Sequence, residues 1–514
     1  MKRKHLILSG ILLLTFGLHL IYYSRWTHDD PFITFRYVRN IAAGKGFVFN
    51  EGVRLEGYSN FLFLILLAPF EIINFPLPGA AKILGFLFSL GTLFLFITFL
   101  RKYYREERWY HYLAAFLVAM SADATLWAVS GMETALSMFF AGAAWIFFSR
   151  EVRMKGEGVP WSSLFLLGAA LNRPEGLIYF IALGACGIYF AFKKQISLKY
   201  LIFWGALFCI PFGFYNSWRV IYFGDIFPNT YYAKATGPVI SRISRGIQYL
   251  FDFIIRNPYL FLLPFTFPFL SKKPNPEKTS ATAMVLAQIF FILHSGGDWM
   301  PLSRFMVPVL LPLFFLSGEG VIITCKLFSE KGKQKIDDIL VTVFVFLVIL
   351  TVALNLKATW PLVYSVRTET LYKPHIRIGL WMKENFPEDS LLAGEEAGII
   401  PYYSELRFLD LLGIVDPYIA RQEGEMHYKF DLDYVLSKKP DYALLYTVNA
   451  YNSEKGEEAL EPRIEPGMQL LSSGEFLKKY DPAISFQHGN DLIGKDYLTL
   501  FVREGAFSPA RRRP

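Results

Sequence analysis

The chain has 514 residues, of which 53% are hydrophobic and only 19% are charged, and its mean hydropathy is +0.32. This composition excludes an ordinary soluble protein and is typical of a chain that crosses a membrane several times. The net charge of +8 therefore does not indicate nucleic-acid binding, because much of it lies in loops between apolar runs. The three cysteines fall within apolar runs, so they indicate neither a disulfide framework nor a metal-ligand spacing.

The apolar runs predict a polytopic α-helical membrane module over residues 1–357. The first run, 6–23, follows basic residues and precedes no small-residue cleavage site, so we expect an uncleaved anchor. The run at 61–73 is about thirteen residues long, too short for a full span, and we expect it not to cross. About eleven transmembrane helices then remain: 6–23, 80–100, 111–128, 134–149, 161–172, 177–192, 200–220, 247–270, 279–294, 305–327 and 338–357.

The basic clusters between these runs predict the orientation of the chain. If the run at 61–73 does not cross, all six clusters lie on the side of the N-terminus, as the positive-inside rule requires. We therefore expect a multi-pass protein of the bacterial inner (cytoplasmic) membrane. Its N-terminus would be cytoplasmic, and its polar loops would lie on the extracytoplasmic side.

The first polar loop, 25–60, carries two adjacent carboxylates, Asp29 and Asp30. Asp30 followed by Pro31 predicts the start of a helix that Asp30 caps. The spacing of apolar residues over Phe32–Ala43 predicts a short amphipathic helix at the membrane interface. A cap alone is the usual meaning of such an aspartate, but the loops that follow favour a function for both acids.

Each further loop on the same side carries a compact polar motif. Taken singly, each motif is compatible with turn punctuation. Charged groups at membrane depth are costly and usually functional, so their presence on one face indicates a site. The motifs are 130–133, with Glu133; 172–176, with Arg173; 224–234, with Asn229, Tyr231, Tyr232 and Lys234; and 294–304, with Asp298, Trp299 and Arg304.

A lipid-linked phosphosugar donor fits acids, cations and aromatic rings at one membrane face. Lys234, Arg304 and Arg173 are candidates to neutralise the donor phosphate, which would also make it a better leaving group. Asp29 or Asp30 could accept the proton of an attacking hydroxyl, and a helix N-terminus would keep such an acid ionised. The candidates for substrate binding are Glu56, Tyr58, Glu133, Asn229, Tyr232, Asp298, Trp299, Asp410 and Asp416.

Hydrophobicity falls after residue 357, and residues 358–514 are predicted to form a small soluble α/β domain on the extracytoplasmic side. The sequence contains no P-loop and no GxGxxG motif, so no nucleotide site is expected. Asp410, Asp416 and His375 either reach the active site or cap strand ends. The expected elements are a helix at 378–386, strands at 390–393 and 407–411, a helix at 432–438 and a strand at 442–446.

At these residues the sequence resembles the GT-C superfamily of membrane glycosyltransferases that use polyprenyl-phosphate sugars. More narrowly, it is similar to the branch that contains the mycobacterial terminal β-(1→2)-arabinofuranosyltransferase. The motifs that carry the resemblance occur in the family's order and end near Ala420. They are DDPFITFRYVRNIAAGKGFVFNEGVRLEGYSN, SGMETAL, LNRPEG, YFGDIFPNTYYAK, GGDWMPLSRFMVP and LDLLGIVD.

The resemblance implies an inverting transfer in which Asp29 and Asp30 are catalytic. It also implies an extracytoplasmic domain that helps to bind the acceptor, an envelope glycan or glycolipid. Some members bind a divalent cation (Mg²⁺, Mn²⁺ or Ca²⁺) near these acids, and Asp29 and Asp30 would be its ligands here. The resemblance does not fix the sugar as arabinofuranose.

The leading hypothesis is a glycosyltransferase with Asp29 as general base and Asp30 as second acid or metal ligand; the two roles could be exchanged. A transferase of whole oligosaccharides shares this architecture. A transporter of lipid-linked sugars would need charged or broken helices near the bilayer midplane and an internal repeat, and the sequence indicates neither. A non-catalytic scaffold for envelope assembly is a further hypothesis. The sequence does not indicate an oligomeric state.

Overall fold

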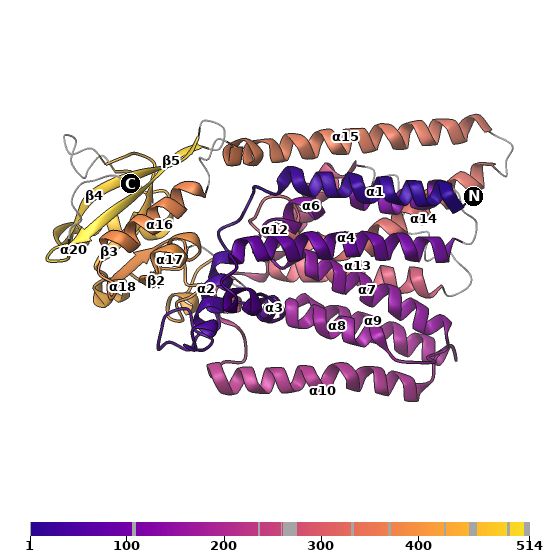
Figure 1. The fold of residues 1–514 in the computed structure, drawn as a ribbon, viewed down its shortest axis with the longest axis horizontal. Coiled ribbons are helices and arrows are strands. Elements are labelled where there is room, and N and C mark those ends of the chain that lie inside the picture. The colour runs from indigo at the N-terminus through magenta and orange to yellow at the C-terminus, as the bar shows by residue number, and fades with distance from the viewer. Residues whose placement is uncertain are drawn as a thin grey trace.

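The computed structural model of the protein describes residues 2–104, 109–234, 237–258, 260, 275–329, 334–367, 372–425, 428–451, 460–490 and 494–507. A bundle of long, roughly parallel helices forms one part, and a sheet with its own helices forms the other (Figure 1). The N-terminus lies at the end of the bundle farthest from the sheet. The polar loop that follows the first helix therefore lies beside the sheet domain.

The bundle accounts for the high hydropathy of the chain. Within the described residues, six helices are long and apolar enough to cross a membrane, so a multi-pass arrangement is supported but the expected number of about eleven spans is not established. The long helices are α1 (Lys2–Tyr23), α4 (Leu77–Tyr103), α7 (Thr134–Arg153), α9 (Glu175–Phe192), α10 (Leu198–Phe223), α13 (Pro276–Ser295), α14 (Leu310–Ser329) and α15 (Gln334–Arg367), with the shorter α8 (Trp161–Asn172) between α7 and α9.

The predicted span at 111–128 is wrong, because a capping serine breaks the helix. Ser121 has an extended backbone (φ −70°, ψ 113°), and its hydroxyl accepts the backbone N–H of Ala124 at 3.2 Å. This bond caps the second helix where the first one ends, although most residues of the run are apolar. The resulting pieces are η1 (Trp109–Tyr112), α5 (Leu113–Met120) and α6 (Ala122–Ala128).

The predicted span at 247–270 also differs from the structure. α12 (Val239–Arg256) starts earlier and is capped by Asn257, and the rest of the predicted span lies largely outside the described residues. One face of α12 is exposed and apolar, while Tyr249 and Phe253 on another face are buried. α12 is therefore an amphipathic helix on the side of the bundle rather than a uniformly apolar span.

α2 (Pro31–Ala42) is the joint between the two parts of the molecule. The expected surface helix is wrong, because all residues from Pro31 to Val38 are buried. The Arg36 guanidinium donates to the carbonyl oxygens of Pro401 and Leu406, each at 2.7 Å, so the sheet domain covers the polar side of the helix. α3 (Phe61–Ile72) has 12 residues, about 18 Å at 1.5 Å per residue, which agrees with the expectation that it does not cross.

The sheet domain has the strand order β2-β1-β3-β5-β4. The first three strands are parallel, and a long antiparallel hairpin, which the sequence did not predict, completes the sheet. The strands and helices that were predicted are confirmed. The strands are β1 (Leu391–Gly394), β2 (Arg407–Asp410), β3 (Tyr442–Thr447), β4 (Tyr480–Asn490) and β5 (Gly494–Arg503); the helices are α16 (Lys373–Asn385), α17 (Ile399–Ser404), η5 (Ile419–Arg421), α18 (Leu432–Lys438), α19 (Glu465–Leu471) and α20 (Gly474–Lys479).

One hydrophobic core runs from the first polar loop into the sheet domain. It includes Phe32 and Phe35 of α2, Leu67 of α3, Ile399 of α17 and Phe408 of β2, all nearly inaccessible to solvent. α15 continues to Arg367, past the expected end of the membrane module at residue 357. The shared core holds the loop with the two aspartates against the sheet domain, and this contact builds the site.

Candidate active site

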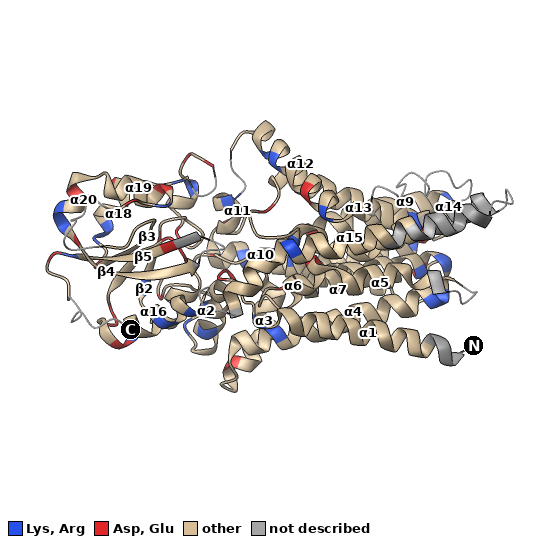
Figure 2. Cartoon of the chain, turned by 90° about the horizontal axis from the view of Figure 1, so that it is seen from above, with Lys and Arg blue, Asp and Glu red and all other residues tan. Residues whose placement is uncertain are grey.

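Charged residues gather on the sheet domain, where it meets the bundle, and at the opposite end of the bundle, whereas few lie along the helices between (Figure 2). Two cavities open at this junction, of about 720 Å³ and about 310 Å³. The larger cavity lies among the polar ends of the bundle helices, and the smaller one lies between the first polar loop and the sheet domain. Both cavities are lined by Asp30, Ile33, Lys234, Trp299 and Ile414.

Asp29 lies just before α2 and faces the smaller cavity only. Its Oδ1 accepts the backbone N–H of Ile399 at 2.7 Å. A Cβ atom on Gly398 would lie 2.2 Å from its Oδ2, so only glycine permits this approach. Burial, and then the charge of Glu396, raise the pKa of Asp29 well above its usual value. This result differs from the expectation that the helix N-terminus keeps the acid ionised.

We expect the substitution Asp29→Asn to weaken the pH dependence of stability. Because the pKa of Asp29 is raised in the folded protein, the unfolded chain loses this proton first as the pH rises above the usual value of 3.8. The wild type therefore loses stability from that pH up to the raised pKa, whereas asparagine keeps an acceptor for Ile399 and has no charge. Thermal midpoints of the detergent-purified protein from pH 4 to 9 measure this.

The control for that experiment is Asp389→Asn, because Asp389 is exposed on the turn before β1. It should leave the pH dependence of the thermal midpoint as in the wild type. An Asp29→Asn variant whose midpoint still falls with pH as steeply as that of the wild type would show that Asp29 is not the group responsible.

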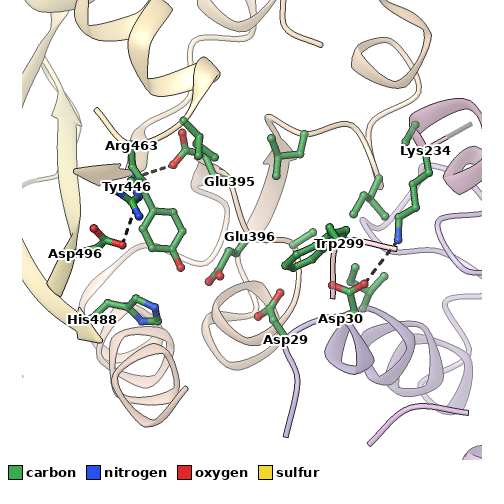
Figure 3. Close-up of a pocket in the computed structure, with 16 residues that line it drawn as sticks. Asp29, Asp30, Lys234, Trp299, Glu395, Glu396, Tyr446, Arg463, His488 and Asp496 are labelled. Carbon is green, nitrogen blue, oxygen red and sulfur yellow. Dashed lines mark hydrogen bonds and ion pairs between the residues drawn. The ribbon is translucent and has the colours of Figure 1, made fainter. Parts of the chain in front are cut away.

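Asp30 is the last residue before α2, but its side chain does not make the predicted capping bond to that helix. Its Oδ2 lies 3.7 Å from Nζ of Lys234, on α11 (Asn229–Lys234), and its Oδ1 lies 3.8 Å from Nδ1 of His28. The side chain is 17% exposed. Asp30 thus borders both cavities, whereas Asp29 borders only one. Figure 3 shows Asp30 beside Lys234 in the smaller cavity.

Arg304 is the best placed of the predicted cations to bind an anion in the larger cavity. It begins η4 (Arg304–Val309), and its Nε lies 2.7 Å from Oδ2 of Asp298. Its Nη1 faces the sulfur of Met132 at 3.2 Å, which is only a weak acceptor. The guanidinium therefore keeps a poorly satisfied donor on the cavity wall. Lys234, 35% exposed, is the other available cation.

Arg173 is held between two buried carboxylates. Its Nη1 lies 2.6 Å from Glu133 and its Nε lies 2.5 Å from Glu175. The Asn60 amide also donates to Glu133 at 2.9 Å. Although burial opposes it, Arg173 and Arg304 lower the pKa of Glu133. Arg173 lines the larger cavity, but its Nη1 and Nε already donate to buried carboxylates, so these contacts are those of a structural ion pair.

Four of the residues predicted to bind substrate do line the larger cavity: Tyr58, Glu133, Asp298 and Trp299. Tyr58 and Glu133 are deeply buried there, whereas Trp299 is 54% exposed and lies where the two cavities meet. Exposed aromatic rings at such a position are suited to packing against a sugar ring.

The other five predicted substrate residues line neither of these two cavities. Their side chains instead connect the polar loops to one another or stabilise the turns after β2. Glu56 pairs with Arg219 at 2.6 Å, and burial raises the pKa of Glu56 to about 7. The Asn229 amide donates to the carbonyl oxygens of Gly413 and Ile414 at 2.8 and 2.9 Å, and Tyr232 donates to Asp225 at 3.3 Å. Asp410 and Asp416 accept backbone N–H groups of the turns after β2, from Leu412, Val415, Tyr418 and Ile419.

The sequence reasoning missed the wall that the sheet domain contributes to the smaller cavity. Glu395 and Glu396 follow β1 directly, at the carboxyl end of a parallel strand, where ligands commonly bind. The strand predicted at 390–393 already indicates that these two acids lie at its carboxyl end. The rest of this wall comes from β3, the β3–α19 segment and the unpredicted hairpin: Tyr446, Arg463, Ile464, His488 and Asp496.

The role of Asp29 and Asp30 as ligands of a divalent cation stays a prediction. Among the described residues, no group of three or more His, Cys, Asp or Glu side chains is arranged to hold a metal ion. Asp29 accepts a backbone N–H and Asp30 lies beside Lys234, so the two predicted metal ligands already have other partners.

Comparison with known proteins places this geometry in context. Residues 364–501 match a family model described as a domain of unknown function, DUF8728. Two curated relatives are both named terminal β-(1→2)-arabinofuranosyltransferase. The one from Mycobacterium tuberculosis is 29% identical over 266 residues, which cover 47% of this chain and 39% of the relative. The one from Corynebacterium glutamicum is 23% identical over 339 residues, covering 56% and 48%. The matches thus span less than half of these relatives.

Solved structures match over most of the chain. ArnT from Cupriavidus metallidurans, bound to undecaprenyl phosphate, aligns with a TM-score of 0.52 and 12% identity over 96% of this chain and 97% of its own. The chain has the GT-C fold. The archaeal oligosaccharyltransferase AglB from Archaeoglobus fulgidus, in complex with an inhibitory peptide and a dolichol-phosphate, aligns with a TM-score of 0.51 and 11% identity, covering 85% and 69%. The resemblance to GT-C enzymes is therefore confirmed at the level of the fold.

Proposed function

We propose that the protein is an inverting glycosyltransferase of the bacterial cytoplasmic membrane, acting at its extracytoplasmic face. It moves one sugar from a polyprenyl-phosphate donor to a hydroxyl of an envelope glycan or glycolipid. The observation that carries this proposal is that Asp30, Lys234 and Trp299 line both cavities of the GT-C fold. Two substrates bound in the two cavities would meet at these side chains.

The donor belongs in the larger cavity. Arg304 and Lys234 lie on its wall, and their donors suit the phosphate oxygens. The exposed apolar face of α12 and the apolar bundle helices beside the cavity suit the polyprenyl tail, because the tail is itself apolar. The curated relatives carry the name arabinofuranosyltransferase, so arabinofuranose is the first sugar to test; transfer of a whole oligosaccharide is the alternative, since AglB shares the fold.

The acceptor belongs in the smaller cavity, with Asp30 as the general base. The acceptor oxygen attacks the anomeric carbon while the bond from that carbon to the phosphate oxygen breaks. The proton of the hydroxyl passes to Asp30, and the lipid phosphate leaves with its charge stabilised by Lys234 and Arg304. Asp29, held by Ile399 and bordering only the acceptor side, positions this loop. This assignment exchanges the roles first expected for the two aspartates.

The proposal is tested with the purified protein in liposomes that contain undecaprenyl phosphate carrying arabinofuranose, mannose, glucose or galactose. The acceptor is envelope glycan extracted from a strain that lacks the gene. Transfer of label to the glycan from at least one donor is the expected result. Absence of transfer from every donor, by a protein that remains folded, contradicts the proposal.

Replacing Lys234 by methionine should lower kcat/KM for the donor about 10–100-fold, the size expected for one charged hydrogen bond to phosphate. The protein should remain folded, because Lys234 is 35% exposed and its ion pair with Asp30 is long, at 3.7 Å. The control is Lys45→Met, which removes an exposed ion pair to Glu51 (2.9 Å) in the same polar loop and should leave transfer unchanged. Equal activity of both variants would remove Lys234 from the donor site.

A further inference from the structure

Buried polar atoms that make no hydrogen bond lie at the sheet-domain end of the smaller cavity, which Glu396 and His488 line, and behind it, where His375 lies. Within the described part of the chain, Oε2 of Glu396, Nδ1 of His375 and Nδ1 of His488 make no hydrogen bond. The first two lie 3.5 Å apart, and the two histidine rings stack at 4.6 Å between centroids. Buried polar atoms without partners are rare in folded proteins and call for a ligand or water.

Glu396 and His488 lie on the side of the cavity that leads to the two aspartates (Figure 3). Glu396 lies between Tyr446 and Asp29, and His488 lies farther from Asp30 than Glu396 does. His375, which is fully buried, backs Glu396 from α16. A molecule that reaches from this cluster to Asp30 would therefore place one end at the proposed base.

The cluster offers both donors and acceptors at neutral pH. Burial lowers the pKa of His375 to about 3 and that of His488 to about 4, so both rings are neutral. A neutral imidazole has one N–H donor and one acceptor nitrogen, and a sugar hydroxyl likewise both donates and accepts. A phosphate or carboxylate group only accepts, so it matches this cluster poorly.

The cavity also offers an anion no unpaired cation. Among the described residues that line it there are two cations, and both are already near carboxylates: Lys234 lies 3.7 Å from Asp30, and Arg463 lies 3.6 Å from Asp496. An anionic acceptor would lose its hydrating water without gaining an unpaired cation, which costs binding free energy in a partly buried site.

We propose that the smaller cavity selects an uncharged sugar as acceptor, and that Glu396, held from behind by His375, and His488 bind its hydroxyl groups. This inference rests on the proposed function and names the class of its acceptor. An acceptor that ends in a phosphate or a uronic acid would be excluded from the site, and Glu396 would be the residue that contributes most to this discrimination.

The experiment uses glycans extracted from a strain that lacks the gene and separated by anion exchange into neutral and anionic fractions. Wild-type protein should use the neutral fraction at least about tenfold better, as kcat/KM per acceptor end. Glu396→Ala should raise the acceptor KM about tenfold, as for one lost hydrogen bond, and leave the donor KM unchanged. Glu396→Gln, which keeps the shape but cannot ionise, should lower the ratio of kcat/KM for the neutral fraction to kcat/KM for the anionic fraction.

The matched control is Glu384→Gln, an exposed acid on α16 that should change neither KM nor the preference. Equal use of the two fractions by the wild type, or an unchanged preference in Glu396→Gln, would overturn the inference while leaving the proposed transfer intact. Failure of every fraction to accept sugar from any donor would instead contradict the proposed function. Thermal midpoints of the variants separate a lost contact from a lost fold.

Discussion

Replacing Asp30 by asparagine should lower the rate of sugar transfer by about 10²–10⁴-fold, the contribution expected of a general base. The asparagine side chain would occupy the same space between the two cavities but could not accept the proton of the acceptor hydroxyl. The donor should bind at least as tightly as before, because Lys234 would lose the carboxylate that competes with the donor phosphate. Single-turnover transfer in liposomes and binding of labelled donor measure the two effects separately.

The comparison that decides this assignment is Asp29→Asn in the same assays. We expect a smaller loss of transfer, because an asparagine in place of Asp29 keeps the bond from the Ile399 N–H and borders only the acceptor cavity. A larger loss for Asp29→Asn than for Asp30→Asn would return the role of base to Asp29. Undiminished transfer in both variants would remove the acid pair from the reaction.

Local patterns predicted the features that depend on neighbours in sequence. Hydrophobic runs indicated the long helices, and α18 (Leu432–Lys438) and β3 (Tyr442–Thr447) lie where alternation and turn residues placed them. The grouping of polar loops on one side was also accessible, because it needs only the count of crossings and the positions of the basic clusters. Asp30, Lys234 and Arg304 meet at the larger cavity for this reason.

Contacts between distant segments could not be predicted in the same way. The apolar face of α2 was assigned to the membrane because the sequence does not show that the sheet domain covers it, where Phe32 and Phe35 pack against Tyr402. A buried polar side chain has the same sequence signal whether it binds a ligand or holds a joint. For that reason Asn229 and Glu56 were expected at the substrate, although they join the loops to each other.

The same limit of the sequence explains why the wall that the sheet domain contributes to the smaller cavity was missed. Glu396 and His488 come from segments more than ninety residues apart, and only the pairing of β1, β3 and β5 brings them together. The shared core between α2 and the sheet domain then sets their distance from the aspartates. Any substitution that weakens the packing of this core should raise the acceptor KM more than the donor KM. The reason is that the sheet domain supplies most of the wall of the smaller cavity and only a small part of the wall of the larger one.

Replacing Arg173 by methionine should destabilise the protein by about 3–5 kcal/mol, the cost typical of removing one partner from a buried ion pair. Glu133 is 2% exposed and Glu175 is 1% exposed, and both would lose the guanidinium that lies 2.6 and 2.5 Å away. The thermal midpoint in detergent, and the fraction of protein that remains monodisperse, should fall accordingly. This result would assign Arg173 to structure rather than to the donor phosphate.

The triple variant Glu133→Gln, Arg173→Met, Glu175→Gln is the control that separates the two roles. It has no buried charge at this point, and the glutamine that replaces Glu133 keeps an acceptor for the Asn60 amide. It should recover most of the lost stability, as replacements of whole buried ion clusters do, and it should bind labelled donor as the wild type does. A triple variant that is stable but no longer binds donor would show that Arg173 binds the donor phosphate. No folding defect would then remain to explain the loss of donor binding.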